Sequence, residues 1–154
     1  INVDMSFREK SVIGSLVLTV GIFGSYFFKV IEAFTSNSSD AIASLPGALI
    51  GVVITVVIVE VVYHVVIAIF SGEEDSDERD RLVDARATRI SYYVLAAGCV
   101  TTIGHMLISE MVSEWLPDSV SRTPIFVANM LVFSFILSEI VGFSMQLFYY
   151  RRGV

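Results

Sequence analysis

Four long apolar stretches divide the chain, and polar or turn-forming residues bound each of them. They run from about residue 11 to 34, 45 to 70, 90 to 108 and 124 to 149. An α-helix rises ~1.5 Å per residue, so about 20 apolar residues cross the ~30 Å hydrocarbon core of a bilayer. The pattern therefore predicts four transmembrane helices joined by short polar segments.

The composition agrees with that prediction. Hydrophobic residues make up 55% of the 154 residues and charged residues 17%, and the mean hydropathy is +0.74. Charged residues make up about a quarter of a soluble domain. We expect one all-α domain over residues 1–154, a four-helix bundle embedded in lipid. A single cysteine, Cys99, allows neither a disulfide framework nor a cysteine-based metal site within one chain.

Most basic residues fall in segments that four crossings place on the same side of the membrane. Eight of the ten are Arg8, Lys10, Arg79, Arg81, Arg86, Arg89, Arg151 and Arg152. Because Lys and Arg accumulate in short loops on the cytoplasmic side, we expect both termini and the polar loop from 71 to 89 to be cytoplasmic.

The loop from 71 to 89 carries much of the acidic charge behind the net charge of -6. Its charges pair at helical spacing, Asp75 with Arg79 and Asp77 with Arg81, which favours a short solvated helix running into the third span. The alternative is a divalent-cation site built from the carboxylates of the loop, Glu73, Glu74, Asp75, Asp77 and Asp80. The order of the acids does not match a calcium-binding loop, and arginines interrupt it.

Capping residues and prolines predict where two of the helices begin. Ser44 and Pro46 favour a start of the second helix after a linker from 35 to 45, and Thr123 with Pro124 favours the start of the fourth.

Small and polar residues predict which helix faces meet. In the first stretch, residues of this kind recur at close to helical spacing: Ser11, Ser15, Ser25 and Lys29. In the third they fall on one side: Ser91, Gly98, Thr101, Thr102, His105 and Ser109. Small faces let transmembrane helices approach closely, so we expect these sides to face the bundle, with His105 in its interior.

Two acidic residues lie near the middle of the membrane in these predicted helices, Glu60 in the second stretch and Glu139 in the fourth. They follow Pro46 and Pro124 by 14 and 15 positions, so the two carboxyls should share a depth near the midplane. An intramembrane carboxyl is a functional-site hypothesis by default, here a pair that handles protons or cations. The alternative is that each Glu is protonated and hydrogen-bonded across helices for packing. The matched acids also suggest two helix pairs duplicated about an axis along the membrane normal.

Other polar side chains accompany the two acids. His64 lies one turn from Glu60 on the same face, Tyr63 is adjacent, and Gln146 shares the face of Glu139. They extend the polar interior toward the cytoplasm in this hypothesis. The simpler interpretation of His64 is a histidine satisfied by neighbours inside the bundle.

We expect no bound metal or cofactor. A haem held by His64 and His105 is excluded, because the two lie toward opposite ends of their spans, ~15 Å apart along the normal. A metal site from Glu60, His64 and Glu139 remains an alternative, but it lacks the second histidine of a zinc protease motif.

Gly47 and Gly51 form a GxxxG pattern about opposite Glu60 on the second helix. Such a pattern motivates a homodimer through this face. The alternative is that both faces of the helix serve neighbours within one bundle.

Three segments carry a resemblance: MSFREKS (5–11), DERDRLVDARATRISYYVLAAG (77–98) and YYRRG (149–153). They resemble a family of small, uncharacterised, four-span prokaryotic membrane proteins. The resemblance implies a four-helix architecture in a prokaryotic plasma membrane with both ends inside, and a native start at Met5. It implies no activity.

Three functional hypotheses follow. The leading one is a small transport or permeation unit that moves a proton or small cation, or a substrate coupled to one. The second is a regulatory or scaffold protein that docks a cytoplasmic partner through its charged loop, at Asp77, Glu78, Arg79, Asp80 and Arg81. The third is a binder of a quinone or other lipophilic cofactor. We expect no nucleic-acid partner, and the common signatures of soluble enzymes are absent from the sequence.

Overall fold

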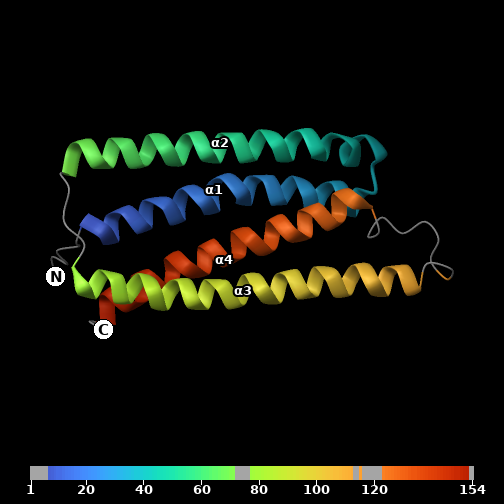
Figure 1. The fold of residues 1–154 in the computed structure, drawn as a ribbon. Helices are drawn as coiled ribbons and strands as arrows, with labels where there is room; N and C mark the ends of the chain where they lie inside the picture. Colours follow the sequence, from blue (N-terminus) through green and yellow to red (C-terminus); the bar gives the residue numbers. More distant parts are fainter. Residues whose placement is uncertain (1–6, 72–76, 113–114, 116–122, 153–154) are drawn as a thin grey trace.

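Four helices make up the fold in the computed structural model, which describes residues 7–71, 77–112, 115 and 123–152 and contains no strand in these ranges. They are α1 (Phe7–Ser36), α2 (Ser39–Ser71), α3 (Glu78–Met111) and α4 (Pro124–Arg152) (Figure 1). Each is long and apolar enough to cross a membrane. The all-α class with four potential spans is confirmed. The start implied at Met5 lies outside the described residues.

Helix α3 begins well before its apolar part, so the charged segment forms its first turns. Asp77 is the N-cap: its carboxylate accepts from the Asp80 backbone N–H at 2.8 Å, and the Asp80 carboxylate accepts from the Asp77 N–H at 3.3 Å. This capping box satisfies two N–H groups that the helix leaves open. The solvated helix running into the third span is confirmed. Asp77 therefore caps the helix and does not pair with Arg81, while Asp75 lies outside the described residues.

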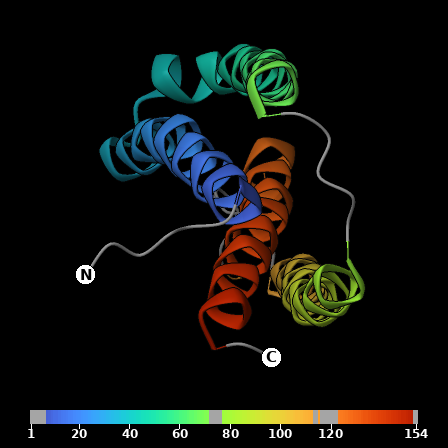
Figure 2. The same ribbon diagram turned by 90° about the vertical axis from the view of Figure 1, so that its left-hand side faces the viewer.

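The linker predicted from 35 to 45 is wrong. Only Asn37 and Ser38 separate α1 from α2, and Asn37 has φ 50°, a left-handed conformation that asparagine tolerates. Pro46 consequently lies inside α2 and not in its first turn. A proline inside a helix lacks the N–H donor and displaces a carbonyl, and the first turns of α2 lie at an angle to the rest (Figure 2). The start of α4 at Pro124 is as predicted.

The helices pack in the spatial order α2–α1–α4–α3. Helix α1 contacts α2 on one side and α4 on the other, and α4 makes its most extensive contact with α3 (Figures 1 and 2). A two-fold axis relating α1–α2 to α3–α4 would require α3 to pack on α2 as α1 packs on α4. No comparable α2–α3 interface exists among the described residues, so the duplicated arrangement is wrong.

The predicted contact face of the third span does pack against α4. A Cβ added to Gly98 would collide with the Ser134 side chain, and Thr102 is buried. Ser91 Oγ donates to the Ser138 carbonyl at 2.9 Å. The small residues let the two backbones approach closely, as expected of transmembrane helices. Thr101 alone of the predicted set is exposed.

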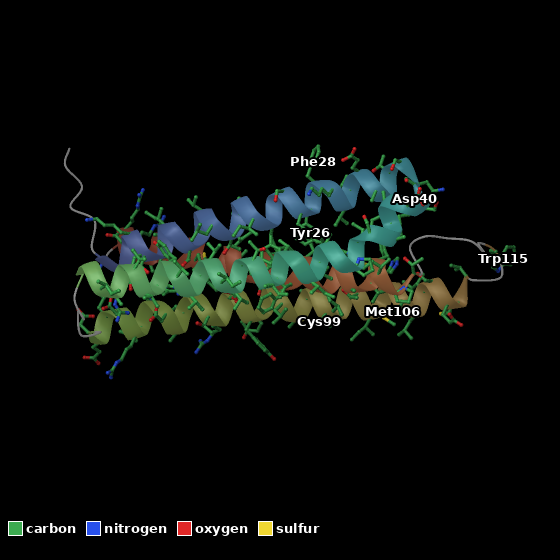
Figure 3. The ribbon with its side chains drawn as sticks, turned by 90° about the horizontal axis from the view of Figure 1, so that it is seen from above. Tyr26, Phe28, Asp40, Cys99, Met106 and Trp115 are labelled. Atoms are coloured by element: carbon green, nitrogen blue, oxygen red, sulfur yellow. The ribbon has the colours of Figure 1, made fainter. Side chains whose placement is uncertain are left out.

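The predicted face of α1 is only half right, because Ser15 is buried but Ser25 and Lys29 are exposed. The buried stripe recurs every three or four residues and consists of Ser15, Thr19, Phe23, Tyr26, Val30 and Ala33. Tyr26 Oη donates to Asn129 Oδ1 of α4 at 2.7 Å. Phe28, two positions on, points away from the other helices (Figure 3). Aromatic packing and this hydrogen bond set the face of α1 in its second half.

One end of the molecule holds the start of α1, the end of α2, the start of α3 and the end of α4 (Figure 1). The eight basic residues grouped by the crossing argument therefore do lie toward one end. At the opposite end α1 turns into α2, and Trp115 lies beyond α3, 83% exposed (Figure 3).

Candidate functional site: a groove with two carboxyls

A cavity of about 610 Å³ lies between α2 and α4, and α1 forms its floor. We call it the α2–α4 groove. Its lining is apolar apart from one hydroxyl and two carboxyls, and consists of Thr19, Phe23, Val53, Val56, Val57, Glu60, Leu131, Val132, Phe135, Ile136, Glu139 and Phe143. The groove exists because α2 and α4 both pack on α1 while making little contact with each other.

Glu60 enters the groove from α2 and is held on one side only. Its Oε2 accepts from Ser15 Oγ of α1 at 3.1 Å and lies 3.4 Å from His64 Nε2, one turn along α2. Its Oε1 is buried and has no hydrogen-bond partner among the described residues. Burying a polar atom without a partner is unfavourable, so Glu60 is held at this site at an energetic cost.

Glu139 enters the same groove from α4. The two acids that share a depth in the sequence thus line one cavity, on walls formed by different helices. Thr19, buried on α1, lines the groove with them. No Lys or Arg is among the lining residues, and the basic group described beside a carboxyl is His64, 3.4 Å from Glu60 Oε2. An ionised carboxylate in hydrocarbon is costly, and a proton or a bound cation removes that cost.

Tyr63 and His64 do not line the groove. Tyr63 Oη donates to the Ser11 carbonyl at 3.1 Å and to the Lys10 carbonyl at 3.3 Å, and its ring fills the space that a Cβ on Gly14 would need. Tyr63 therefore fastens α2 to the start of α1. His64 has 58% of its side chain exposed and reaches the site through Glu60 alone, at the end of the molecule where the basic residues gather.

Gln146 and His105 lie apart from the groove. Gln146 is half-buried on α4, one turn beyond the lining residue Phe143. The His105 ring packs 5.4 Å from Phe126, and Nε2 lies 3.4 Å from Ser109 Oγ, toward the other end of the molecule. The predicted interior around four ionisable residues is thus reduced to the two acids.

The described residues contain no group of three His, Cys, Asp or Glu side chains placed to hold a metal ion. The alternative metal site from Glu60, His64 and Glu139 is therefore not formed. Glu73, Glu74 and Asp75, part of the alternative cation site in the loop, lie outside the described residues.

Two residues at the groove, Ser15 and Thr19, were not predicted as site residues from the sequence. Ser15 was assigned only to a helix-contact face, and Thr19 was not singled out at all. Ser15 and Thr19 are four positions apart, so they lie one turn apart on the same face of α1. Two hydroxyl residues at that spacing in an apolar stretch were the signal that the sequence offered.

The charged first turns of α3 form a second cluster, which joins three helices at the basic end. Arg8 of α1 pairs with Asp80 at 3.2 Å and with Asp84 at 3.7 Å. Tyr150 of α4 donates its hydroxyl to Asp80 at 3.0 Å, and Arg79 donates to the Tyr150 carbonyl at 3.0 Å.

Three of the five residues proposed for partner docking are thus engaged within the chain. Asp77 caps α3, and Asp80 and Arg79 hold the helix ends together. Glu78 and Arg81 are the exposed remainder. The arrangement favours a structural role for this cluster.

Comparison with known proteins finds no matching family model, no matching curated protein and no matching solved structure. The resemblance to small four-span prokaryotic membrane proteins stays a prediction, and function is argued from the groove itself.

Proposed function

We propose that this protein transports a proton or a small cation, or a substrate whose movement is coupled to one. We further propose that it lies in the plasma membrane of a prokaryote, with both ends in the cytoplasm. The observation that carries the proposal is the pair of carboxyls, Glu60 and Glu139, on facing walls of one apolar groove. Charged groups inside a membrane mark ion and proton pathways because the protein sustains their cost only where they act. The gathering of basic residues at one end supports the orientation.

The roles follow from the contacts. Ser15 orients the Glu60 carboxyl by donating to Oε2, which leaves Oε1 as the oxygen that accepts a proton. His64, exposed and 3.4 Å from the same carboxyl, relays protons between Glu60 and the cytoplasmic surface. Glu139 is the second proton site, on the opposite wall.

The test is flux across proteoliposomes that contain the purified protein, followed with an entrapped pH-sensitive dye under an imposed cation gradient. Glu60→Gln and Glu139→Gln each keep the size and hydrogen-bonding capacity of the side chain but remove its charge. We expect each to reduce flux by roughly tenfold or more.

Glu32→Gln is the matched control, because Glu32 is an exposed acid on α1 outside the groove. Its flux should equal that of the unaltered protein. Absence of flux under every gradient, or equal flux in all three variants, would show that the acids serve packing alone.

A second copy of the chain is the partner we propose for α2. Gly47 and Gly51 are exposed, and a Cβ added to either meets no atom within 4 Å. None of the other described residues covers the face of α2 that carries these two glycines. This argues against the alternative in which both faces of α2 contact helices of the same chain. A small, flat surface of this kind lets a second helix approach closely.

Dimerisation is measured by energy transfer between labelled copies in liposomes at low protein density. Gly47→Leu with Gly51→Leu should abolish the transfer, whereas Gly24→Leu, which also meets open space but on α1, should preserve it. Transfer unaffected by the α2 double variant contradicts a dimer through this face.

A further inference from the structure

The size and walls of the α2–α4 groove suit an organic ligand. Its volume of about 610 Å³ falls within the range of roughly 300–1,000 Å³ typical of small-molecule sites. Three phenylalanines, Phe23, Phe135 and Phe143, line it from α1 and α4. Aromatic faces attract cations as well as apolar groups, so these walls favour a ligand that is both lipophilic and positively charged.

The polar groups of the groove call for a positive charge. Its two carboxyls stand on different helices, no basic side chain lines it, and Glu60 Oε1 is buried without a hydrogen-bond partner among the described residues. An anionic ligand would meet two acids, and a neutral apolar ligand would leave the buried oxygen as it is. A cation complements the two carboxyls of a groove that has no basic lining residue, whereas a neutral apolar ligand leaves both acids uncompensated.

A bare metal ion fits less well than an organic cation. Hard cations need six or more oxygen ligands, while the groove offers two carboxyls and the hydroxyl of Thr19. An organic cation spreads its charge and takes most of its contacts from apolar walls. It also reaches the site directly from the lipid, because the groove runs between α2 and α4, which stand apart on either side of α1 (Figure 2).

We infer that the α2–α4 groove binds a lipophilic organic cation between Glu60 and Glu139. Resting on the proposed function, we assign this cation as the transported substrate, exchanged for the protons that the two carboxyls carry. Binding displaces a proton from a carboxyl, and reprotonation expels the cation, so charge is balanced at each step.

Titratable groups that reach the site are few. Among the described residues they are Glu60, its neighbours Tyr63 and His64 on α2, and Glu139 on α4, while α1 contributes only the hydroxyls of Ser15 and Thr19. Because protons and the cation compete for the same carboxyls, binding weakens as the pH falls.

The experiment measures binding of radiolabelled tetraphenylphosphonium to the purified full chain in lipid nanodiscs, at about pH 6 and about pH 8.5, because a cation that displaces protons binds more weakly as the proton concentration rises. We expect saturable binding that is tighter at the higher pH, with protons released on binding. Glu60→Gln and Glu139→Gln should each weaken it by roughly tenfold or more, while Glu32→Gln leaves it unchanged. Triphenylphosphine oxide, similar in shape but uncharged, should not compete.

Val57→Trp provides a second variant, because it fills the groove from α2 and leaves both carboxyls in place. It should abolish binding, and it tests the site even if a Gln variant fails to fold. Absence of saturable binding, binding that survives both Gln variants, or equal competition by the uncharged analogue would overturn the inference.

The two proposals fail separately. Saturable binding without coupled proton flux leaves the binding site standing and overturns the transport role. Proton flux through Glu60 and Glu139 without tetraphenylphosphonium binding overturns the ligand class and leaves the transport role standing.

Discussion

The two outer helices, α3 and α2, are held to their neighbours in different ways. Helix α3 packs against α4, and α2 packs against α1. Between α3 and α4, small residues bring the backbones close: Gly98 lies against Ser134, and Ser91 donates to the Ser138 carbonyl. Helix α2 is fastened to α1 mainly at its ends, by Leu45 in a small apolar cluster and by Tyr63. Its most apolar window contains no buried residue.

This difference separates a closely packed scaffold from the side of the molecule that carries the groove. Burial of apolar surface drives no association in lipid, so close packing and hydrogen bonds must hold transmembrane helices together. The α3–α4 pair has these along its length. In the middle of α2 the hydrogen bond from Ser15 to Glu60 stands in place of close packing, and there the groove and its two carboxyls are found. Three substitutions test the contrast, from the largest expected effect to the smallest.

The closest approach in the scaffold should be the most sensitive position. Gly98→Ala places a Cβ against the Ser134 side chain and should destabilise the fold by about 2–3 kcal/mol by forcing α3 and α4 apart. The free energy of unfolding in mixed micelles measures it.

Gly51→Ala is the control on α2, where the new Cβ meets open space. It should change stability by less than about 1 kcal/mol, in the direction of greater stability, because alanine is the better helix former. An equal change in unfolding free energy for Gly98→Ala and Gly51→Ala would contradict the difference in packing between the two helix pairs.

The buried hydrogen bond between α1 and α4 should have an intermediate effect. Tyr26→Phe leaves Asn129 Oδ1 without its donor and should cost about 1–2 kcal/mol. Tyr92→Phe, at an exposed ring on α3, should be neutral. A neutral result at Tyr26 would mean that α1 is held to α4 by apolar contact alone.

The charged cluster at the basic end should have the smallest effect. Arg8→Gln removes the pairs with Asp80 and Asp84, and partly exposed ion pairs contribute only about 0.5 kcal/mol. The loss should shrink as salt is raised, because salt screens such pairs. Arg151→Gln, at an exposed residue near the end of α4, is the control. If the loss of stability in the Arg8 variant did not depend on salt concentration, Arg8 would have a role other than ion pairing.

The interior site could be predicted only in part. The shared depth of Glu60 and Glu139 follows from helix rise, and the structure lines one cavity with them. His105 and Gln146 were grouped with them by face and polarity, but which neighbour a face meets depends on helix order. The order α2–α1–α4–α3 leaves both outside the groove.

The helix ends show the same limit on a local scale. The start of α4 at Pro124 and the charged first turns of α3 were predicted, because capping and helical charge spacing act within a few residues. The start of α2 was not. Ser44 and Pro46 give a plausible start, but a continuous helix from Ser39 satisfies more backbone hydrogen bonds, and this matters more in a membrane than the strain at one proline.

The sequence by itself determined that this chain forms four apolar helices, grouped its basic residues at one end and gave two acids a common depth. Those properties depend on hydropathy, helix rise and the number of crossings, all of which are read along one chain. The tertiary structure decided which helices touch, and with that the groove, the position of His105 away from it, and the uncovered face at Gly47 and Gly51. In lipid, where helices are apolar nearly all round, their order depends on close contacts such as that of Gly98 with Ser134, which no periodicity reveals.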